Sequence, residues 1–203
     1  MTSAWVVFFL EVIYAITTIL GFLSLNSPQD PIGDPYFTIM EVLIILIAPS
    51  MLICMLVVNA YATSDVKVYS NISLIFMILL ATITSSVHFT ILTVSRQIEL
   101  SGLQGSNLFF GFRWPSVAYT LDILAWDWFF ALSLFFAVPV FKGPSLMKAV
   151  RVLMIVSGVL SLAGLAGIPL ADMQIRNIGI IGYAIIAPFV FLLIGIVFSR
   201  TKV

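Results

Sequence analysis

Apolar residues run through this chain in six long blocks, each about as long as a membrane-crossing helix. The hydrocarbon core of a bilayer is about 30 Å thick, and about 20 helical residues cross it. We expect spans at 4–25, 37–62, 68–94, 117–141, 147–170 and 178–200. Turn-forming residues separate several blocks, among them Pro35, Gly143-Pro144 and Pro169. The pattern predicts an all-α integral membrane protein, a six-transmembrane-helix bundle in which residues 1–203 form a single transmembrane domain.

The composition agrees with this prediction and excludes a water-soluble fold. Of the 203 residues, 62% are hydrophobic and 9% are charged, whereas soluble domains carry about 25% charged residues. The hydrophobic content makes the lipid bilayer the expected partner. The formal net charge is zero, so we expect no binding to nucleic acid. The first span lacks a basic leading segment and contains Glu11, so we expect it to be retained rather than cleaved as a signal peptide.

Lysine and arginine residues in the short loops predict the orientation of the chain. Basic residues gather on the cytoplasmic side of membrane proteins. One side would hold Lys67, Lys142, Lys148, Arg151, Arg200 and Lys202, and the other Arg96, Arg113 and Arg176. We therefore expect both termini in the cytoplasm and the protein in a plasma (inner) membrane.

Short matches between the two halves indicate a further level of organisation. The segment Ala4-Trp5-Val6-Val7-Phe8-Phe9 matches Ala125-Trp126-Asp127-Trp128-Phe129-Phe130, and Asn71-Ile72 recurs as Asn177-Ile178. Two inverted three-helix repeats, an arrangement common among transporters, would explain these matches. Such short matches between apolar segments also arise by chance, so a bundle without a repeat is the alternative.

Four acidic residues inside the predicted spans are the strongest functional signal in the sequence. They are Glu11, Glu41, Asp122 and Asp127. A charged carboxylate at the bilayer centre costs about 2.5–3.5 kcal/mol on insertion scales, so such residues commonly mark functional sites. The lone histidine, His88, lies at a depth similar to that of Glu41 and Asp122, within about 10 Å of the outer boundary.

Asp127 lies deeper, near the midplane, between Trp126 and Trp128. Together these depths predict an outward-facing polar pocket inside the membrane. Its ligand or proton site would consist of Glu41, His88, Asp122, Asp127 and Trp126.

Two further groups flank the expected site. Glu11 and Arg151 both lie within about 10 Å of the cytoplasmic face, so we expect an inner ion pair between the first and fifth spans. The external loop 95–116 mixes aromatic residues with bases, including Arg96 and the pair Arg113-Trp114. This composition suits the membrane interface, and we expect Arg113 and Trp114 to form either an aromatic belt or an outer lid over the site.

Helical geometry adds further expectations. Asp122 and Asp127 lie about 140° apart around a regular helix, so we expect them to face different neighbours. Pro49 and Pro188 predict kinks in the second and sixth spans.

The outer half of the third span is dense in polar side chains, and we expect it to face protein or water. Thr84, His88 and Ser95 would share one face. The alternative is that the hydroxyls bond to carbonyl groups of their own helix.

These observations favour a small transporter or ligand-binding membrane protein, proton-coupled through Asp127, with a small molecule or a proton as ligand. The first alternative is an intramembrane enzyme that uses His88 and a carboxylate for acid–base chemistry on a lipid-soluble substrate. The second is an accessory subunit whose polar groups meet partner helices. With one histidine and one cysteine we expect neither metal nor cofactor. A chain of this size could form a homo-oligomer to enclose a pathway.

Overall fold

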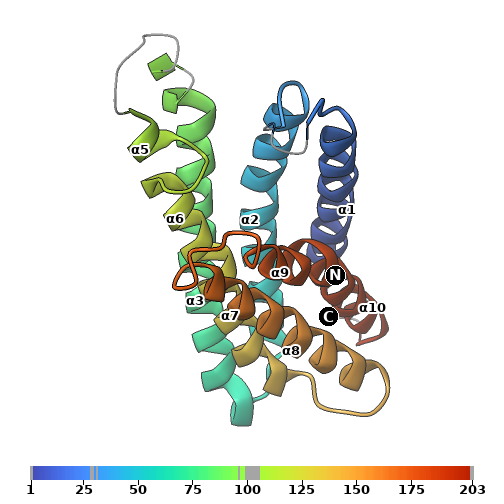
Figure 1. Ribbon diagram of the computed structural model, residues 1–203. Helices are drawn as coiled ribbons and strands as arrows, with labels where there is room; N and C mark the ends of the chain where they lie inside the picture. The colour runs from blue at the N-terminus through green and yellow to red at the C-terminus, as the bar shows by residue number, and fades with distance from the viewer. Residues whose placement is uncertain (1, 28–29, 31, 96, 99–105, 202–203) are drawn as a thin grey trace.

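The computed structural model describes residues 2–27, 30, 32–95, 97–98 and 106–201 (Figure 1). The first two spans are α1 (Thr2–Leu23) and α2 (Tyr36–Tyr61). The third consists of η1 (Ser64–Val66), α3 (Lys67–Thr90) and the π-helix η2 (Ile91–Ser95). A short helix, α5 (Ser106–Phe110), follows in the long connection.

The other three spans are each built from several helical segments. The fourth comprises α6 (Val117–Ile123), the π-helix η3 (Leu124–Phe129), α7 (Phe130–Ala137) and η4 (Val138–Val140). The fifth is α8 (Leu146–Gly164) with η5 (Leu165–Gly167). The sixth is α9 (Asn177–Ile180), the π-helix η6 (Ile181–Ile186) and α10 (Ala187–Thr201).

Within the described residues, six helices are long and apolar enough to cross a membrane, which confirms the predicted bundle. Each span packs against the next along the chain, and α10 returns to pack against α1. The connecting residues 24–27, 32–35 and 106–116 lie at one end of the bundle, and the turns before α3 and α8 lie at the other (Figure 1).

Local hydrogen bonds explain where two of the spans begin. The Ser116 hydroxyl accepts from the Tyr119 backbone N–H at 3.1 Å, which caps α6 in the usual way for a serine N-cap. The same hydroxyl donates to the Gly111 carbonyl at 2.5 Å and so fixes the preceding loop to the cap. The Asp34 carboxylate accepts from the Thr38 backbone N–H at 3.1 Å in the first turn of α2.

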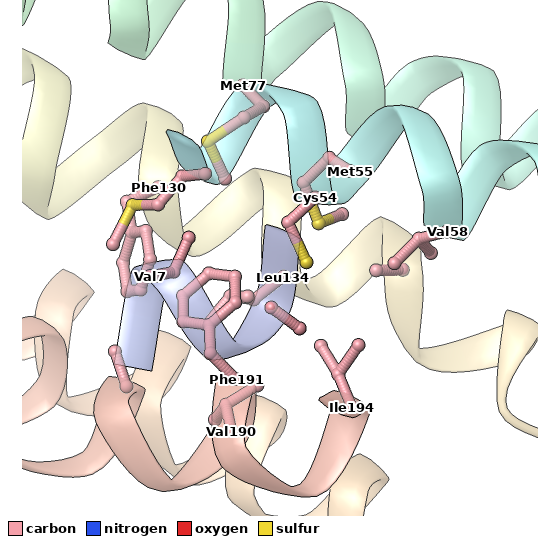
Figure 2. Packing of buried hydrophobic residues seen from close by; sticks show 14 of the residues in the cluster. Val7, Cys54, Met55, Val58, Met77, Phe130, Leu134, Val190, Phe191 and Ile194 are labelled. Atoms are coloured by element: carbon pink, nitrogen blue, oxygen red, sulfur yellow. The ribbon is translucent and has the colours of Figure 1, made fainter. Parts of the chain in front are cut away.

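One apolar core fills the half of the bundle that contains the turns before α3 and α8. Figure 2 shows Val7 of α1, Cys54 of α2, Met77 of α3, Phe130 of α7 and Phe191 of α10 gathered there. All five side chains are fully buried. These side chains pack closely, as in the interior of a folded protein.

Buried serines join the spans across this core. The Ser73 hydroxyl donates to the Ser133 carbonyl at 2.7 Å, and the Ser133 hydroxyl donates to the Ser73 carbonyl at 2.9 Å. The Ser157 hydroxyl donates to the Gly182 carbonyl at 2.8 Å and joins α8 to η6. Such bonds between helices hold the register of spans that have little hydrophobic reason to associate within lipid.

Candidate functional site: a buried ionic network

Glu41 and His88 meet near the outer-loop ends of α2 and α3. The His88 Nδ1 lies 2.6 Å from Glu41 Oε2, and both side chains are buried. Glu41 is five residues from the start of α2, and His88 is two residues from the end of α3. Because α2 and α3 run antiparallel and pack together, their opposite chain ends bring these two residues to the same depth.

Asp122 continues the network from the fourth span. Its Oδ1 lies 3.2 Å from His88 Nε2, and its Oδ2 accepts from Arg176 Nη2 at 3.0 Å. Both nitrogens of the imidazole therefore face carboxylate oxygens. A neutral imidazole has only one N–H, so the arrangement needs an extra proton, on His88 or on one of the carboxyl groups.

Arg176 is the centre of the second half of the network. It lies immediately before α9 and is 5% exposed. Its Nε donates to Asp127 Oδ2 at 3.3 Å, and its Nη1 donates to the Tyr119 hydroxyl at 2.8 Å. Burial would lower the pKa of Arg176, but the acidic groups around it, Tyr183 and Asp122 foremost, raise that pKa above its ordinary value. The guanidinium therefore stays charged.

The five side chains Glu41, His88, Asp122, Arg176 and Asp127 form what we call the buried network. It comprises three acids and two bases, so its formal charge with all groups ionised is 2 − 3 = −1. Each member is at most 5% exposed. An unmatched charge away from water is costly, so one proton or another small cation would balance the network.

Asp127 is the member with the weakest contacts. Its Oδ1 is buried and has no hydrogen-bond partner within the described part of the chain. The side chain faces the backbone of Gly179, where an added Cβ would overlap Oδ1. No donor among the described residues therefore stabilises a negative charge on Asp127 Oδ1 through a hydrogen bond.

The expectation that Asp122 and Asp127 face different neighbours is wrong, because both bind Arg176. The reason is the π-helix η3, which begins two residues after Asp122 and contains Asp127. A π-helix bonds each residue to the fifth along rather than the fourth, so residues five apart come onto one face. Asp122 also contacts the third span, through His88.

Some polar side chains in the second half of α3 and in η2 are buried against other spans, whereas others bond to carbonyl groups of their own helix. Thr84, His88 and Ser95 are buried, as their shared face predicts. Ser86, Thr90 and Thr93 instead donate to carbonyl groups one turn back, at 2.7–2.8 Å; Ser86 and Thr93 are exposed and Thr90 is half-buried. For these three hydroxyls the alternative holds, since they bond to carbonyl groups of their own helix.

The sequence pattern used Arg176 only as one of the basic loop residues that predict the orientation of the chain. The one local hint of its role is its position directly before the sixth span, at the same end of the bundle as the acids. Reaching Asp122 requires contact between residues 54 apart in the chain. Such a pairing depends on how the loop returns over the bundle, and no local pattern encodes it.

Trp126 and the expected lid residues lie in different surroundings. Trp126 is buried and its ring contacts Tyr183, with centroids 5.3 Å apart. Arg113 and Trp114 are exposed and line a shallow surface hollow with Leu108 and Pro115. Neither of them covers the network through any contact recorded in the described residues, and Arg96 lies outside those residues.

A different residue of the same loop covers the site. The Phe112 ring lies 5.4 Å from the His88 ring and 5.3 Å from the Tyr119 ring, measured between centroids. Phe112 also packs on the small outer cluster of Val87, Ile91 and Ala118. The loop thus covers the network with the aromatic side chain of Phe112, two residues after the end of the short helix α5.

Glu11 and Arg151 are not brought together. The Arg151 guanidinium donates to the Gly143 carbonyl at 3.3 Å, and both carboxyl oxygens of Glu11 lack a hydrogen-bond partner among the described residues. The expected inner ion pair is therefore wrong in this structure. The physical reason is that α1 packs against α2 and α10, whereas Arg151 lies on α8 close to the turn that precedes it.

The fold and the site together define a multi-pass α-helical membrane protein with a closed ionic network in one half of its bundle. The chain matches no protein-family model, no curated protein and no solved structure. Its function therefore has to be argued from its own residues.

Proposed function

We propose that this protein is a small proton-coupled membrane transporter whose proton-binding site is the buried network. The observation that carries the proposal is the imbalance of three buried acids against two buried bases. An ion pair kept only for stability would be balanced, because each uncompensated buried charge costs several kcal/mol. Uptake of one proton makes the network neutral.

Asp127 is the proposed proton-binding residue. Among the residues that the structure describes, its Oδ1 has no hydrogen-bond donor, and its ion-pair contact is the 3.3 Å bond from Arg176 to Oδ2. By contrast, Asp122 accepts from two cationic groups and Glu41 lies 2.6 Å from His88. Of the three acids, Asp127 therefore loses the fewest favourable contacts when it binds a proton.

Protonation of Asp127 would couple to the packing of the spans. Arg176 links Asp127 and Asp122 of the fourth span to the segment before α9, and Asp122 links onward to α3 and α2. A neutral Asp127 holds the guanidinium less strongly, so the segment before α9 is freed to move against η3. The protonated and the ionised forms of Asp127 would thereby favour two different arrangements of the same helices.

The apolar core supplies the opposite closure that a transporter needs. Core residues such as Met55, Met154 and Phe198 lie toward the other end of the bundle and are at most 1% exposed. With both termini in the cytoplasm, as the loop charges predict, the network would lie in the outer half and the core on the inner side. Alternating opening of these two halves is the proposed cycle.

The enzyme alternative receives less support. His88 and two carboxylates do converge within hydrogen-bond reach, as acid–base catalysis requires. However, both ring nitrogens already face carboxylate oxygens, which leaves His88 no free nitrogen to accept a proton from a substrate. The contacts thus suit storage of a proton better than chemistry on a bound molecule.

The test is direct detection of the proton. Infrared difference spectra of the protein in liposomes, recorded between acidic and alkaline pH, should show the carbonyl stretch of a protonated carboxylic acid. Asp127→Asn should remove this band and abolish proton movement into liposomes that carry an imposed pH gradient. Asp172→Asn, at an exposed acid of the neighbouring loop, is the matched control and should change neither readout.

Retention of the band and of proton movement in Asp127→Asn would refute the role of Asp127. Loss of both readouts in the Asp172→Asn control would show that the signal does not come from the buried network.

A further inference from the structure

Arg113 and Trp114 are exposed side chains that the buried network does not use. The structure records no hydrogen bond, ion pair or ring contact for either of them among the described residues. Together with Leu108 and Pro115 they line a surface hollow of about 350 Å³. Arg113 is also the one charged residue between positions 106 and 116. The hollow therefore presents a cation and an indole N–H that lack an acceptor in the described part of the chain.

The segment that carries these two side chains is held in place on both sides. Before it, the Ser95 hydroxyl donates to the Phe110 carbonyl at 2.8 Å, and after it, the Ser116 hydroxyl donates to the Gly111 carbonyl. Between these bonds the Phe112 ring packs inward over the network. The next two residues along the chain are exposed. The hollow is thus shaped by an anchored backbone, so a ligand would bind there with little loss of loop entropy.

The hollow lies where the fourth span meets the membrane interface. That span begins at Val117, two residues after Pro115. Positions just outside a span lie at the level of the lipid headgroups, where tryptophan is enriched and arginine extends its charged group toward water. The charged groups nearest to the hollow are therefore those of lipid headgroups.

An exposed apolar stripe continues from the hollow along the fourth span. Val117, Leu121 and Leu124 are all exposed large hydrophobic side chains. Their spacing places them on one face of the helix, and this face meets acyl chains in a bilayer. A cation at headgroup level and an apolar stripe at the level of the acyl chains are thus continuous with each other.

We propose that this hollow binds the headgroup of an anionic phospholipid. The Arg113 guanidinium binds the lipid phosphate, because its fork of N–H donors matches the phosphate oxygens. The Trp114 indole N–H donates to a second oxygen of the headgroup. One acyl chain lies along Val117 and Leu121. The inference concerns a surface site and does not depend on the proposed proton transport.

The charge and shape of the hollow favour this occupant over two others. A zwitterionic phospholipid also carries an ammonium group, and the segment 106–116 has no acid to receive it. A soluble phosphate anion would leave the adjoining apolar stripe unused. An anionic lipid uses the arginine, the tryptophan and the stripe together.

Native mass spectrometry of the full chain measures this binding directly. The protein is placed in a non-ionic detergent with equal amounts of phosphatidylglycerol and phosphatidylcholine that carry the same acyl chains. We expect the parent to retain phosphatidylglycerol in preference to phosphatidylcholine. Arg113→Gln should lower the retained phosphatidylglycerol by about fivefold or more. Trp114→Phe, which keeps an aromatic ring and loses the N–H, should lower it by about two- to fivefold.

Arg200→Gln is the matched control, because it removes the same charge from an exposed arginine in the last turn of α10, at the opposite end of the bundle. It should leave the preference for phosphatidylglycerol unchanged. Arg113→Gln and Trp114→Phe should both unfold at the temperature of the parent, since neither side chain has a recorded partner in the described residues.

Four outcomes would overturn the proposal. The first is equal retention of the two lipids by the parent, and the second is retention at the parent level in both Arg113→Gln and Trp114→Phe. The third is an equal loss in Arg113→Gln and Arg200→Gln, because general attraction of charges would then explain the binding. The fourth is displacement of phosphatidylglycerol by excess glycerol 3-phosphate, which would assign the hollow to a soluble phosphate anion instead.

Discussion

The buried acids of this protein differ in how completely their oxygens are satisfied, and that difference assigns their roles. Asp122 is bound by His88 and Arg176, whereas Asp127 has one long contact and one unpartnered oxygen. We therefore propose that Asp122 acts as an anchor and Asp127 as the proton acceptor. Glu11, which has no hydrogen-bond partner on either oxygen among the described residues, represents the extreme case.

The stability of two variants should reflect this asymmetry. Asp122→Asn weakens two charge-assisted contacts and should destabilise the protein by about 3–5 kcal/mol. Asp127→Asn balances the network at two acids and two bases and should leave stability unchanged or raise it by up to about 1 kcal/mol. Thermal unfolding in detergent measures the stability of both variants. The readout is a fluorogenic maleimide, which reacts with the lone Cys54 once unfolding exposes this buried thiol. A larger loss in Asp127→Asn than in Asp122→Asn would contradict the assignment.

Removal of the central cation should be more damaging still. Arg176→Gln leaves Asp122 and Asp127 facing each other with only His88 to offset them, and should cost at least about 3–5 kcal/mol. Arg176→Lys should recover only part of this, because one amine cannot reproduce the three-way fork to Asp122, Asp127 and Tyr119. The same thiol-reaction assay provides the measurement.

Arg151→Gln is the matched control, since Arg151 makes a single 3.3 Å bond to a loop carbonyl. We expect a change within about 0.5 kcal/mol. Equal losses for Arg176→Gln and Arg151→Gln would mean that the network contributes nothing particular to the fold.

The π-helical segments decide which side chains of the spans reach the network. The segment η6 ends at Ile186, two residues before Pro188, whose missing N–H and bulky ring disfavour a regular α-helical turn there. The expected irregularity at Pro188 therefore takes the form of a π-helix. Segment η3 contains no proline, and its sequence Leu-Ala-Trp-Asp-Trp-Phe gives no comparable warning. Here tertiary contacts to Arg176 select the wider turn that the sequence leaves open.

Glycines let α8 approach η6 and α9 closely enough to position Asp127. A Cβ on Gly179 would overlap Asp127 Oδ1 and lie 3.3 Å from the Ser161 carbonyl oxygen. A Cβ on Gly182 would lie 2.6 Å from the Ser157 carbonyl oxygen. The close approach therefore brings the backbone of α8 at Ser157 and Ser161 against α9 and η6.

Gly179→Ala should therefore force these helices apart, with a loss of about 1–3 kcal/mol and a weaker carboxyl signal from Asp127. Gly33→Ala is the control, because a Cβ at Gly33 meets nothing within 4 Å. That control should be neutral in the unfolding assay. If both alanine variants unfold at the same temperature as the parent, the close helix crossing does not matter for stability.

The bundle as a unit divides into a polar half and an apolar half along its axis. Glu41 and His88 lie near the ends of α2 and α3 that meet the long connections (Figure 1). Core residues such as Met55 and Val58 (Figure 2) lie toward the opposite end of α2. The proposed transport cycle depends on this division, because the two halves would open in turn. The inverted repeat, the homo-oligomer and the cytoplasmic termini stay predictions.

The apolar half should act as one packed seal. Phe191→Ala removes a fully buried ring and should cost about 3–5 kcal/mol, with faster maleimide reaction at Cys54 in the folded protein. Phe189→Ala is the control on the same helix, since Phe189 is 51% exposed toward the surrounding lipid. It should change stability by less than about 1 kcal/mol. Equal Cys54 reactivity in the two variants would argue against a closed seal.

The sequence by itself determined the six spans, because length and hydropathy are local properties and the cost of exposing a backbone to lipid permits few alternatives. It also determined which acids matter, since a carboxylate in an apolar block is costly wherever its partner lies. Grouping by depth correctly joined Glu41, His88 and Asp122. Only the tertiary structure decided that Arg176 completes the group, that Asp122 and Asp127 share it, and that Glu11 stands alone. Those pairings depend on helix neighbours, a returning loop and a π-helical turn, which side-chain contacts between distant segments select.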